Sequence, residues 1–106
     1  MISNKSNSPV PQKVTGVSLH SYKGLNNEQM VMLKWDDVNT SNIKSYEIYY
    51  AVGKKEKFVK ANSSNIIDCA FIHIPDGKSK SIAYKVRAVD YWDRKGEFSD
   101  VSLMEY

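Results

Sequence analysis

The sequence predicts an all-β domain in which two antiparallel sheets pack face to face. Residues 84–90 read Tyr-Lys-Val-Arg-Ala-Val-Asp and residues 33–35 read Leu-Lys-Trp. Both segments alternate apolar and polar side chains with a period of two, which is typical of strands with one buried and one solvated face. A Trp on one such strand and a Tyr at the start of another, about fifty residues later, fit the two facing sheets of a small sandwich.

Seven segments of strand-like composition follow one another between turn residues, at the spacing of a small sandwich. They cover residues 13–20, 29–35, 43–52, 58–59, 66–74, 82–90 and 98–104. Gly-Leu-Asn-Asn at 24–27, Pro-Asp-Gly-Lys at 75–78 and Arg-Lys-Gly-Glu at 94–97 are expected to be turns between them. Residues 1–10 are rich in Ser, Asn and Pro, so we expect a flexible linker there and the folded domain at residues 11–106.

The alternation within each strand predicts which side chains face the core. These are Val17 and Leu19 in the first strand, Val31, Leu33 and Trp35 in the second, Tyr46, Ile48 and Tyr50 in the third, and Tyr84, Val86 and Ala88 in the sixth. We expect Trp35, Tyr46, Ile48, Tyr84 and Val86 to form the centre of this core. The register of the third strand slips near Lys44.

The strand at residues 66–74 has an ambiguous register because both of its faces are apolar. Either the alternate residues from Ala70 to Ile74, with Ile72 between them, or those from Cys69 to His73 could face the core. We favour the first set, since the second buries the His73 imidazole, which would then need a hydrogen-bond partner.

Composition and charge exclude several classes of protein. The 106 residues suffice for one domain, and 42% of them are hydrophobic, enough to form a core. The net charge of +3 comes from 15 basic and 12 acidic residues, and the basic ones are mostly spread singly, which argues against nucleic-acid binding. No apolar run is long enough to span a membrane, and no signal sequence is recognised. The single Cys69 excludes an internal disulfide, so packing alone must stabilise the fold.

Catalytic chemistry at neutral pH could involve only His20, Cys69 and His73. Cys69 and His73 share one face of a strand but lie about 13 Å apart along it, too far for a nucleophile to bond its base. These residues contain no closely spaced ligand pair of the kind found in zinc sites, and no loop matches a calcium-binding motif. We therefore expect no catalytic residue, no metal site and no cofactor.

Two groups of residues are candidates for contacts with other molecules. Exposed aromatic rings beside charged groups are typical of sugar-binding sites, which makes Tyr91, Trp92 and Arg94 candidate ligand contacts. Alternatively, these rings cover the open end of the sandwich or pack against a neighbouring domain. A second candidate is an apolar surface for a neighbouring domain, formed by Tyr22, Tyr49 and the outward-facing Met30 and Met32.

An ordered set of motifs links the chain to a known family. The set consists of Pro11, Val-Ser-Leu at 17–19, Leu-Lys-Trp at 33–35, Tyr-Glu-Ile-Tyr-Tyr at 46–50, the segment 84–90 and Gly-Glu-Phe-Ser at 96–99. With these motifs the chain resembles a fibronectin type III domain over residues 11–106. The resemblance implies an immunoglobulin-like sandwich of seven antiparallel strands, three on four, with Trp35 at its centre. It also implies a tyrosine corner, in which the Tyr84 hydroxyl bonds to the backbone of the preceding turn.

The same resemblance carries the expected function. The motifs look most like bacterial copies of the module, which occur in extracellular glycoside hydrolases, and the Arg-Gly-Asp tripeptide of cell adhesion is missing. The resemblance implies a non-catalytic accessory module, a spacer or inter-domain docking element of a secreted, multimodular bacterial carbohydrate-active enzyme. Its partners would be neighbouring domains of the same polypeptide, and the isolated domain would be a monomer. The alternative is a module that binds a glycan or a protein through the aromatic residues 91 and 92.

Overall fold

The structure, a computed structural model, describes residues 9–38, 42–53, 57–75 and 80–105. Within these ranges the chain forms seven strands and no helix. The strands are β1 (Ser18–Lys23), β2 (Gln29–Lys34), β3 (Ile43–Val52), β4 (Val59–Lys60), β5 (Ala70–His73), β6 (Ser81–Asp90) and β7 (Ser102–Glu105).

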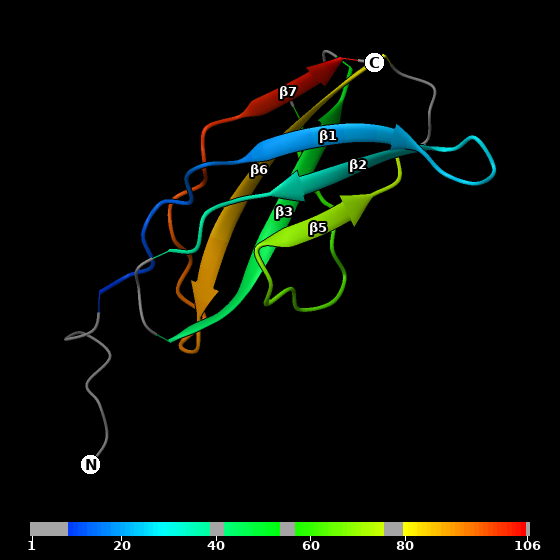
Figure 1. Cartoon of the computed structure of the whole chain (residues 1–106). Coiled ribbons are helices and arrows are strands. Elements are labelled where there is room, and N and C mark those ends of the chain that lie inside the picture. Colours follow the sequence, from blue (N-terminus) through cyan, green and yellow to red (C-terminus); the bar gives the residue numbers. More distant parts are fainter. Residues whose placement is uncertain (1–8, 39–41, 54–56, 76–79, 106) are drawn as a thin grey trace.

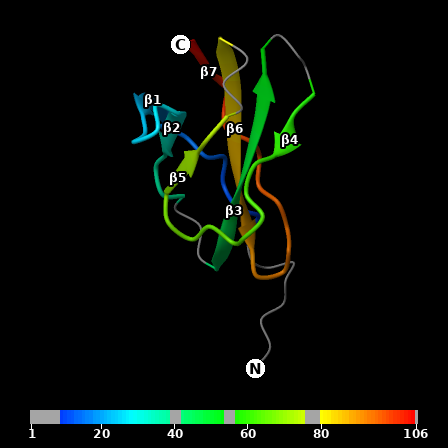
Figure 2. The ribbon, with the colours of Figure 1, turned by 90° about the vertical axis from the view of Figure 1, so that its right-hand side faces the viewer.

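The strands form two antiparallel sheets that face each other (Figures 1 and 2). The smaller sheet has the order β1-β2-β5 and the larger one the order β4-β3-β6-β7. This architecture confirms the predicted all-β sandwich of three strands on four. Figure 2 shows the two layers nearly edge-on, with β1, β2 and β5 on one side and β3, β4 and β6 on the other.

The core lies between the sheets and is built mainly from β2, β3 and β6. The side chains of Ile48 and Val86 are opposite each other across β3 and β6, and both are inaccessible to solvent. All five side chains expected at the centre are buried, and Val31 and Leu33 of β2 reach them from the smaller sheet. In the middle of β3 and β6 the buried side chains recur with a period of two, so each of these strands turns one face to the core.

Trp35 connects the two sheets just beyond the end of β2. Its ring meets the Tyr46 ring of β3 edge-on, with the centroids 5.4 Å apart. Its backbone N–H donates to the Cys69 carbonyl (3.1 Å), and the Tyr46 N–H donates to the Ile66 carbonyl (2.8 Å). The segment that leaves the larger sheet after β4 is therefore bonded first to β3 and then to the end of β2, before it pairs with β2 as β5.

The favoured register of the fifth strand is wrong. Phe71 and Cys69 pack against the core, whereas the side chains of Ile72 and Ile74 are 46% and 56% exposed. The partner that the His73 imidazole needs is present, because its Nδ1 lies 2.7 Å from the Tyr84 hydroxyl. The expected tyrosine corner involves the turn before β6, where residues 76–79 lie outside the described part of the chain.

Several strand boundaries also differ from the predictions. β1 begins at Ser18 and continues to Lys23, whereas residues 13–17 approach the core as an irregular segment with Val14 fully buried. The turn after β6 comes earlier than expected. Residues 91–94 form it, and Lys95, which was assigned to the turn, already bridges Val89. The slip expected near Lys44 is present as an irregularity in the pairing between β3 and β6.

We predict that Trp35→Ala lowers the free energy of unfolding by about 3–5 kcal/mol, because it removes a buried indole and leaves a cavity between the sheets. A urea titration followed by far-ultraviolet circular dichroism measures the change. Leu103→Ala is the matched control, since its side chain is 61% exposed on β7. Equal losses in the two variants would contradict the central position of Trp35.

Candidate functional site

The turn between β6 and β7 is organised by Asp90, the last residue of β6. The Asp90 side chain is 1% exposed, and its Oδ1 accepts the backbone N–H groups of Trp92 and Arg94, each at 2.9 Å. Its Oδ2 accepts the Nε–H of Arg94 at 2.8 Å. Asp93 takes the left-handed conformation (φ 61°), which Asp tolerates better than most residues, so the chain can reverse within four residues.

The hydrogen bonds determine the charge state of Asp90. Burial by itself raises the pKa of this carboxyl. The backbone and side-chain hydrogen bonds from Arg94 and the backbone bond from Trp92 lower the pKa by more than burial raises it. The net result is a pKa below the usual value of 3.8, so the side chain is an anion at neutral pH. Asp90 and Arg94 therefore form a buried ion pair that fixes the shape of the turn.

The structure brings the three candidate ligand contacts to this turn but gives them different surroundings. Tyr91 is 68% exposed. Trp92 is partly buried, and the Arg94 guanidinium lies over its ring, 5.2 Å from the centroid. Arg94 also donates to the carbonyl of Pro9 at 3.3 Å. Of the three side chains, Tyr91 is the one that projects freely, while Trp92 and Arg94 contact each other. Their role as ligand contacts stays a prediction.

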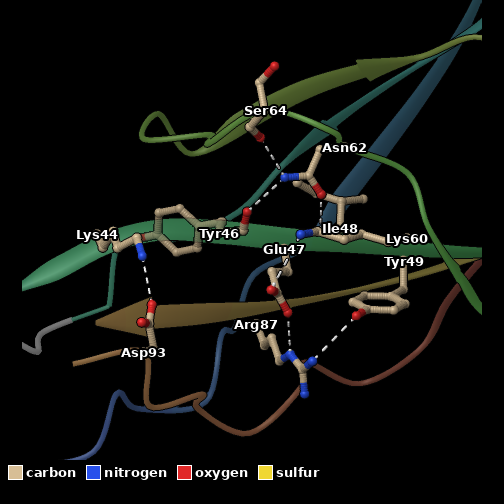
Figure 3. A network of polar contacts seen from close by, with 10 residues as sticks. All are labelled: Lys44, Tyr46, Glu47, Ile48, Tyr49, Lys60, Asn62, Ser64, Arg87 and Asp93. Carbon is tan, nitrogen blue, oxygen red and sulfur yellow. Dashed lines mark hydrogen bonds and ion pairs between the residues drawn. The ribbon is translucent and has the colours of Figure 1, made fainter. Parts of the chain in front are cut away.

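A second polar cluster lies on the outer face of the larger sheet (Figure 3). Glu47 of β3 is at its centre, with a side chain that is only 12% exposed. Its Oε1 accepts the Nε–H of Arg87 at 2.8 Å, and its Oε2 lies 3.5 Å from the Lys60 ammonium. Burial raises the pKa of Glu47, but the hydrogen bond and charge of Arg87 and the charges of Lys60 and Lys95 lower it more, so the net pKa is below 4.5.

Aromatic and basic side chains cover the rest of this outer face. Arg87 lies 4.4 Å from the centroid of the Phe98 ring and also packs over Tyr49. Lys85 lies between the rings of Phe98 and Phe58, with its Nζ at 4.1 and 4.5 Å from their centroids. We call these five residues together with Glu47 the cation–aromatic layer. Cation–π contacts of this kind bury the alkyl stems and rings against the sheet.

Asn62 ties the segment between β4 and β5 to this sheet. Its side chain accepts the Ile48 N–H at 2.9 Å and donates to the carbonyls of Tyr46 and Ser64 at 3.1 and 3.0 Å (Figure 3). The buried amide thus supplies bonds that a neighbouring strand would otherwise make to β3. The same view shows an ion pair between the start of β3 and the β6–β7 turn, in which the Lys44 Nζ donates to the Asp93 Oδ1 at 2.6 Å.

Of the three groups with neutral-pH chemistry, His20 is exposed on β1, whereas His73 and Cys69 each contact a tyrosine within the sandwich. His73 bonds the Tyr84 hydroxyl, and its ring also packs on Tyr50 with the centroids 4.4 Å apart. The Cys69 thiol lies 3.6 Å from the hydroxyl of Tyr46. Burial is the main cause of the raised pKa of Tyr46, and the bond to Cys69 adds to it. The sequence did not reveal the partnership of His73 with Tyr84, which joins the two sheets.

The second surface expected from the sequence is divided between the two sheets. Tyr22 and Met30 are opposite each other on β1 and β2, with Met32 two residues further along β2. Tyr49 belongs to β3 of the other sheet, where its ring packs edge-on against Phe98 at 5.2 Å. The prediction that Tyr49 shares a surface with the other three is wrong, because neither the strand order nor the sheet in which each strand lies is visible in local alternation.

The described residues contain neither a metal-ligand cluster nor a membrane-spanning helix. In the part of the chain that the structure describes, no three His, Cys, Asp or Glu side chains come together as ligands for a metal ion. The described strands and connections also include no helix with the length and apolar character needed to cross a membrane.

The fold and the motifs on it define a fibronectin type III-like module. Among solved structures, a fibronectin type III-like protein from Clostridium thermocellum has this fold, with a TM-score of 0.63, 14% identity and 93% coverage of both chains. The profile of the α-L-iduronidase C-terminal domain family matches residues 15–105. The chain therefore belongs to the family of α-L-iduronidase C-terminal domains, which are associated with glycoside hydrolases of family 39.

Two relatives show how large the parent proteins of this family are. Mouse α-L-iduronidase is 36% identical over 72 residues, which are 66% of this chain and 11% of the mouse protein. The bacterial orthologue of human α-L-iduronidase has a TM-score of 0.69 and 26% identity, covering 92% of this chain and 15% of the bacterial one. The chain thus spans well under a fifth of the length of each of these two relatives.

We predict that Asp90→Ala lowers the free energy of unfolding by about 2–4 kcal/mol, because it removes three hydrogen bonds and leaves Arg94 without its buried partner. Asp93→Asn is the matched control in the same turn, because Asn removes the charge but also tolerates the left-handed conformation of this position. Asp93 is exposed and its ion pair with Lys44 is screened by solvent, so the loss there should be much smaller. Chemical denaturation of both variants measures the difference, and similar losses would contradict the organising role of Asp90.

We predict that His73 makes the domain less stable in mild acid. Burial lowers the pKa of His73 in the folded state below its ordinary value of 6.5. As the pH falls below about 6.5, the unfolded chain binds more protons than the folded one, so the free energy of unfolding decreases. The lowered carboxyl pKa values of Glu47 and Asp90 affect stability only near and below their ordinary values of 4.5 and 3.8.

Urea titrations between about pH 7.5 and about pH 5 test this prediction. His73→Gln should abolish most of the pH dependence in this range. His20→Gln, which changes an exposed histidine of β1, should retain it. A pH dependence that survives His73→Gln would show that another group is responsible.

Proposed function

We propose that this chain is the non-catalytic C-terminal accessory domain of a secreted, multidomain glycoside hydrolase of the iduronidase type. In this proposal it packs against, and holds in place, the preceding part of the same polypeptide. The observation that carries the proposal is the match of residues 15–105 to a family defined as a C-terminal domain, in relatives several times longer than this chain. The resemblance to modules of extracellular bacterial glycoside hydrolases supports secretion.

The way the chain enters the sandwich supports a holding role. We call residues 9–17 the entry segment. Its Pro9 carbonyl accepts a bond from Arg94, its Lys13 ammonium lies 2.7 Å from Asp100, and Val14 is fully buried. Gly96 comes so close that a Cβ there would lie 2.7 Å from the carbonyl oxygen of Pro11. The entry segment is therefore fixed to the sandwich from Pro9 onward.

The side chains in the described part of the chain suit support rather than chemistry. Cys69 and His73 are each engaged with a tyrosine of the core. Arg94 is held by Asp90, which leaves Tyr91 as the exposed member of the candidate ligand contacts. Recognition of a glycan or a protein through Tyr91 is therefore the alternative function, and the geometry favours the accessory role over it.

Unfolding this domain within the parent protein tests the proposal. We expect the parent protein carrying Trp35→Ala, or lacking the domain, to melt several degrees lower than the wild type, because it loses the contact between domains. The variant parent protein that remains folded should hydrolyse a fluorogenic α-L-iduronide with the same KM as the wild type. The isolated 106-residue chain should not hydrolyse this substrate. A parent protein whose melting temperature is unaffected by removal of the domain would overturn the proposal.

A further inference from the structure

The pairing within the smaller sheet determines which of its side chains point away from the core. Leu33 pairs with Phe71, and both contact the core. Side chains alternate between the two faces of a strand, so the neighbouring row points to the opposite side. This row consists of His20, Met32 and Ile72, which are opposite one another on β1, β2 and β5.

This outward side of the smaller sheet is apolar. It carries Tyr22, Met30, Met32, Ile72 and, just beyond β5, Ile74, which together we call the outer apolar face. Tyr22 is 38% exposed, and Ile72 and Ile74 are about half exposed. An antiparallel sheet that meets water on one side normally carries polar residues there, so this face departs from the expected pattern.

The outer apolar face continues into a hollow at the β1–β2 hairpin. The hollow has a volume of about 510 Å³, and Tyr22, Leu25 and Met30 are its large apolar lining residues. Leu25 is fully exposed at the tip of the hairpin. Glu28 also lines the hollow, but its carboxylate is turned to the backbone N–H of Asn26 at 3.0 Å. The apolar surface therefore extends from the outward side of the sheet into a concave region at the hairpin, which suits contact with a protein partner.

The two outer faces of the sandwich differ in what covers them. On the larger sheet the cation–aromatic layer lies over the strands, with Arg87 and Lys85 packed on Phe98. On the smaller sheet no comparable layer is present among the described residues, and the isoleucines of β5 and its C-terminal end reach solvent. The difference indicates that something outside these residues covers the smaller sheet.

Charge and connectivity indicate which partner this is. The outward strand positions of the face include Lys34 and no carboxylate, so these positions in a second copy of the face would offer Lys34 no acidic partner. The entry segment leads directly into β1, and the relatives have long chains outside this domain. We propose that the outer apolar face docks onto the preceding domain of the same polypeptide, at an apolar patch edged by carboxylates. This inference rests on the proposed function.

The two outward methionines are natural probes of this contact. The isolated chain and the full parent protein would be treated with hydrogen peroxide, and sulfoxide formation would be followed by peptide mass spectrometry. We expect Met30 and Met32 to oxidise about tenfold more slowly in the parent protein than in the isolated chain. A tenfold ratio of rates corresponds to a docking equilibrium that is favoured by roughly 1.4 kcal/mol. Met104, which packs on the core from β7 of the other sheet, is the internal control and should oxidise at the same rate in both.

A pair of matched variants separates this surface from the rest of the domain. Ile72→Glu places a charge on the outer apolar face, and Leu103→Glu places the same charge on exposed β7. Both isolated variants should melt close to the wild type, since neither side chain is buried. In the parent protein, Ile72→Glu should restore fast oxidation of Met30 and Met32, whereas Leu103→Glu should not.

Each other outcome has a defined meaning. If removal of the domain destabilises the parent but Met30 and Met32 oxidise equally fast in the parent and in the isolated chain, the accessory function stands and the docking surface is wrong. An isolated chain that dimerises in sedimentation experiments, with both methionines protected in the dimer, would identify a second copy as the occupant and overturn the proposal.

Discussion

The pairing of β3 with β6 is the constraint on which the rest of the structure depends. These two strands of ten residues each place Ile48 and Val86 in the core, and the same pairing places Glu47 opposite Arg87 on the outer face. β6 also ends in Asp90, whose carboxylate shapes the next turn. Core, outer ion pair and turn are thus consequences of one register, and a slip by one residue would exchange the two faces.

The fold could be predicted because residues 33–35 at the end of β2 and residues 84–90 of β6 alternate apolar and polar side chains. The fifth strand could not be placed in the same way, since the residues on both of its faces are apolar. In the observed register the His73 imidazole is satisfied by the Tyr84 hydroxyl, which belongs to a strand of the other sheet. Local alternation contains no information about such a distant partner, so a histidine that looks costly to bury is satisfied in the folded protein.

The turn after β6 shows the same limit for the candidate site. Because Tyr91, Trp92 and Arg94 are close in sequence, their placement in one turn could be predicted. Their sequence positions do not show that the Arg94 side chain folds back onto Asp90 and over the Trp92 ring. The direction of a side chain depends on the turn conformation, here on the left-handed Asp93. Three neighbours that look like one exposed cluster are therefore one projecting ring and two packed groups.

The lengths of the outermost strands affect how this domain can associate with other chains. β4 has two residues, β5 and β7 have four each, and these strands form three of the four sheet edges. Short edges offer few unpaired backbone groups, so they are poor templates for the strand-by-strand growth that produces fibrils. An exposed apolar surface can therefore be retained on the flat side of the smaller sheet with a reduced risk of amyloid-like aggregation.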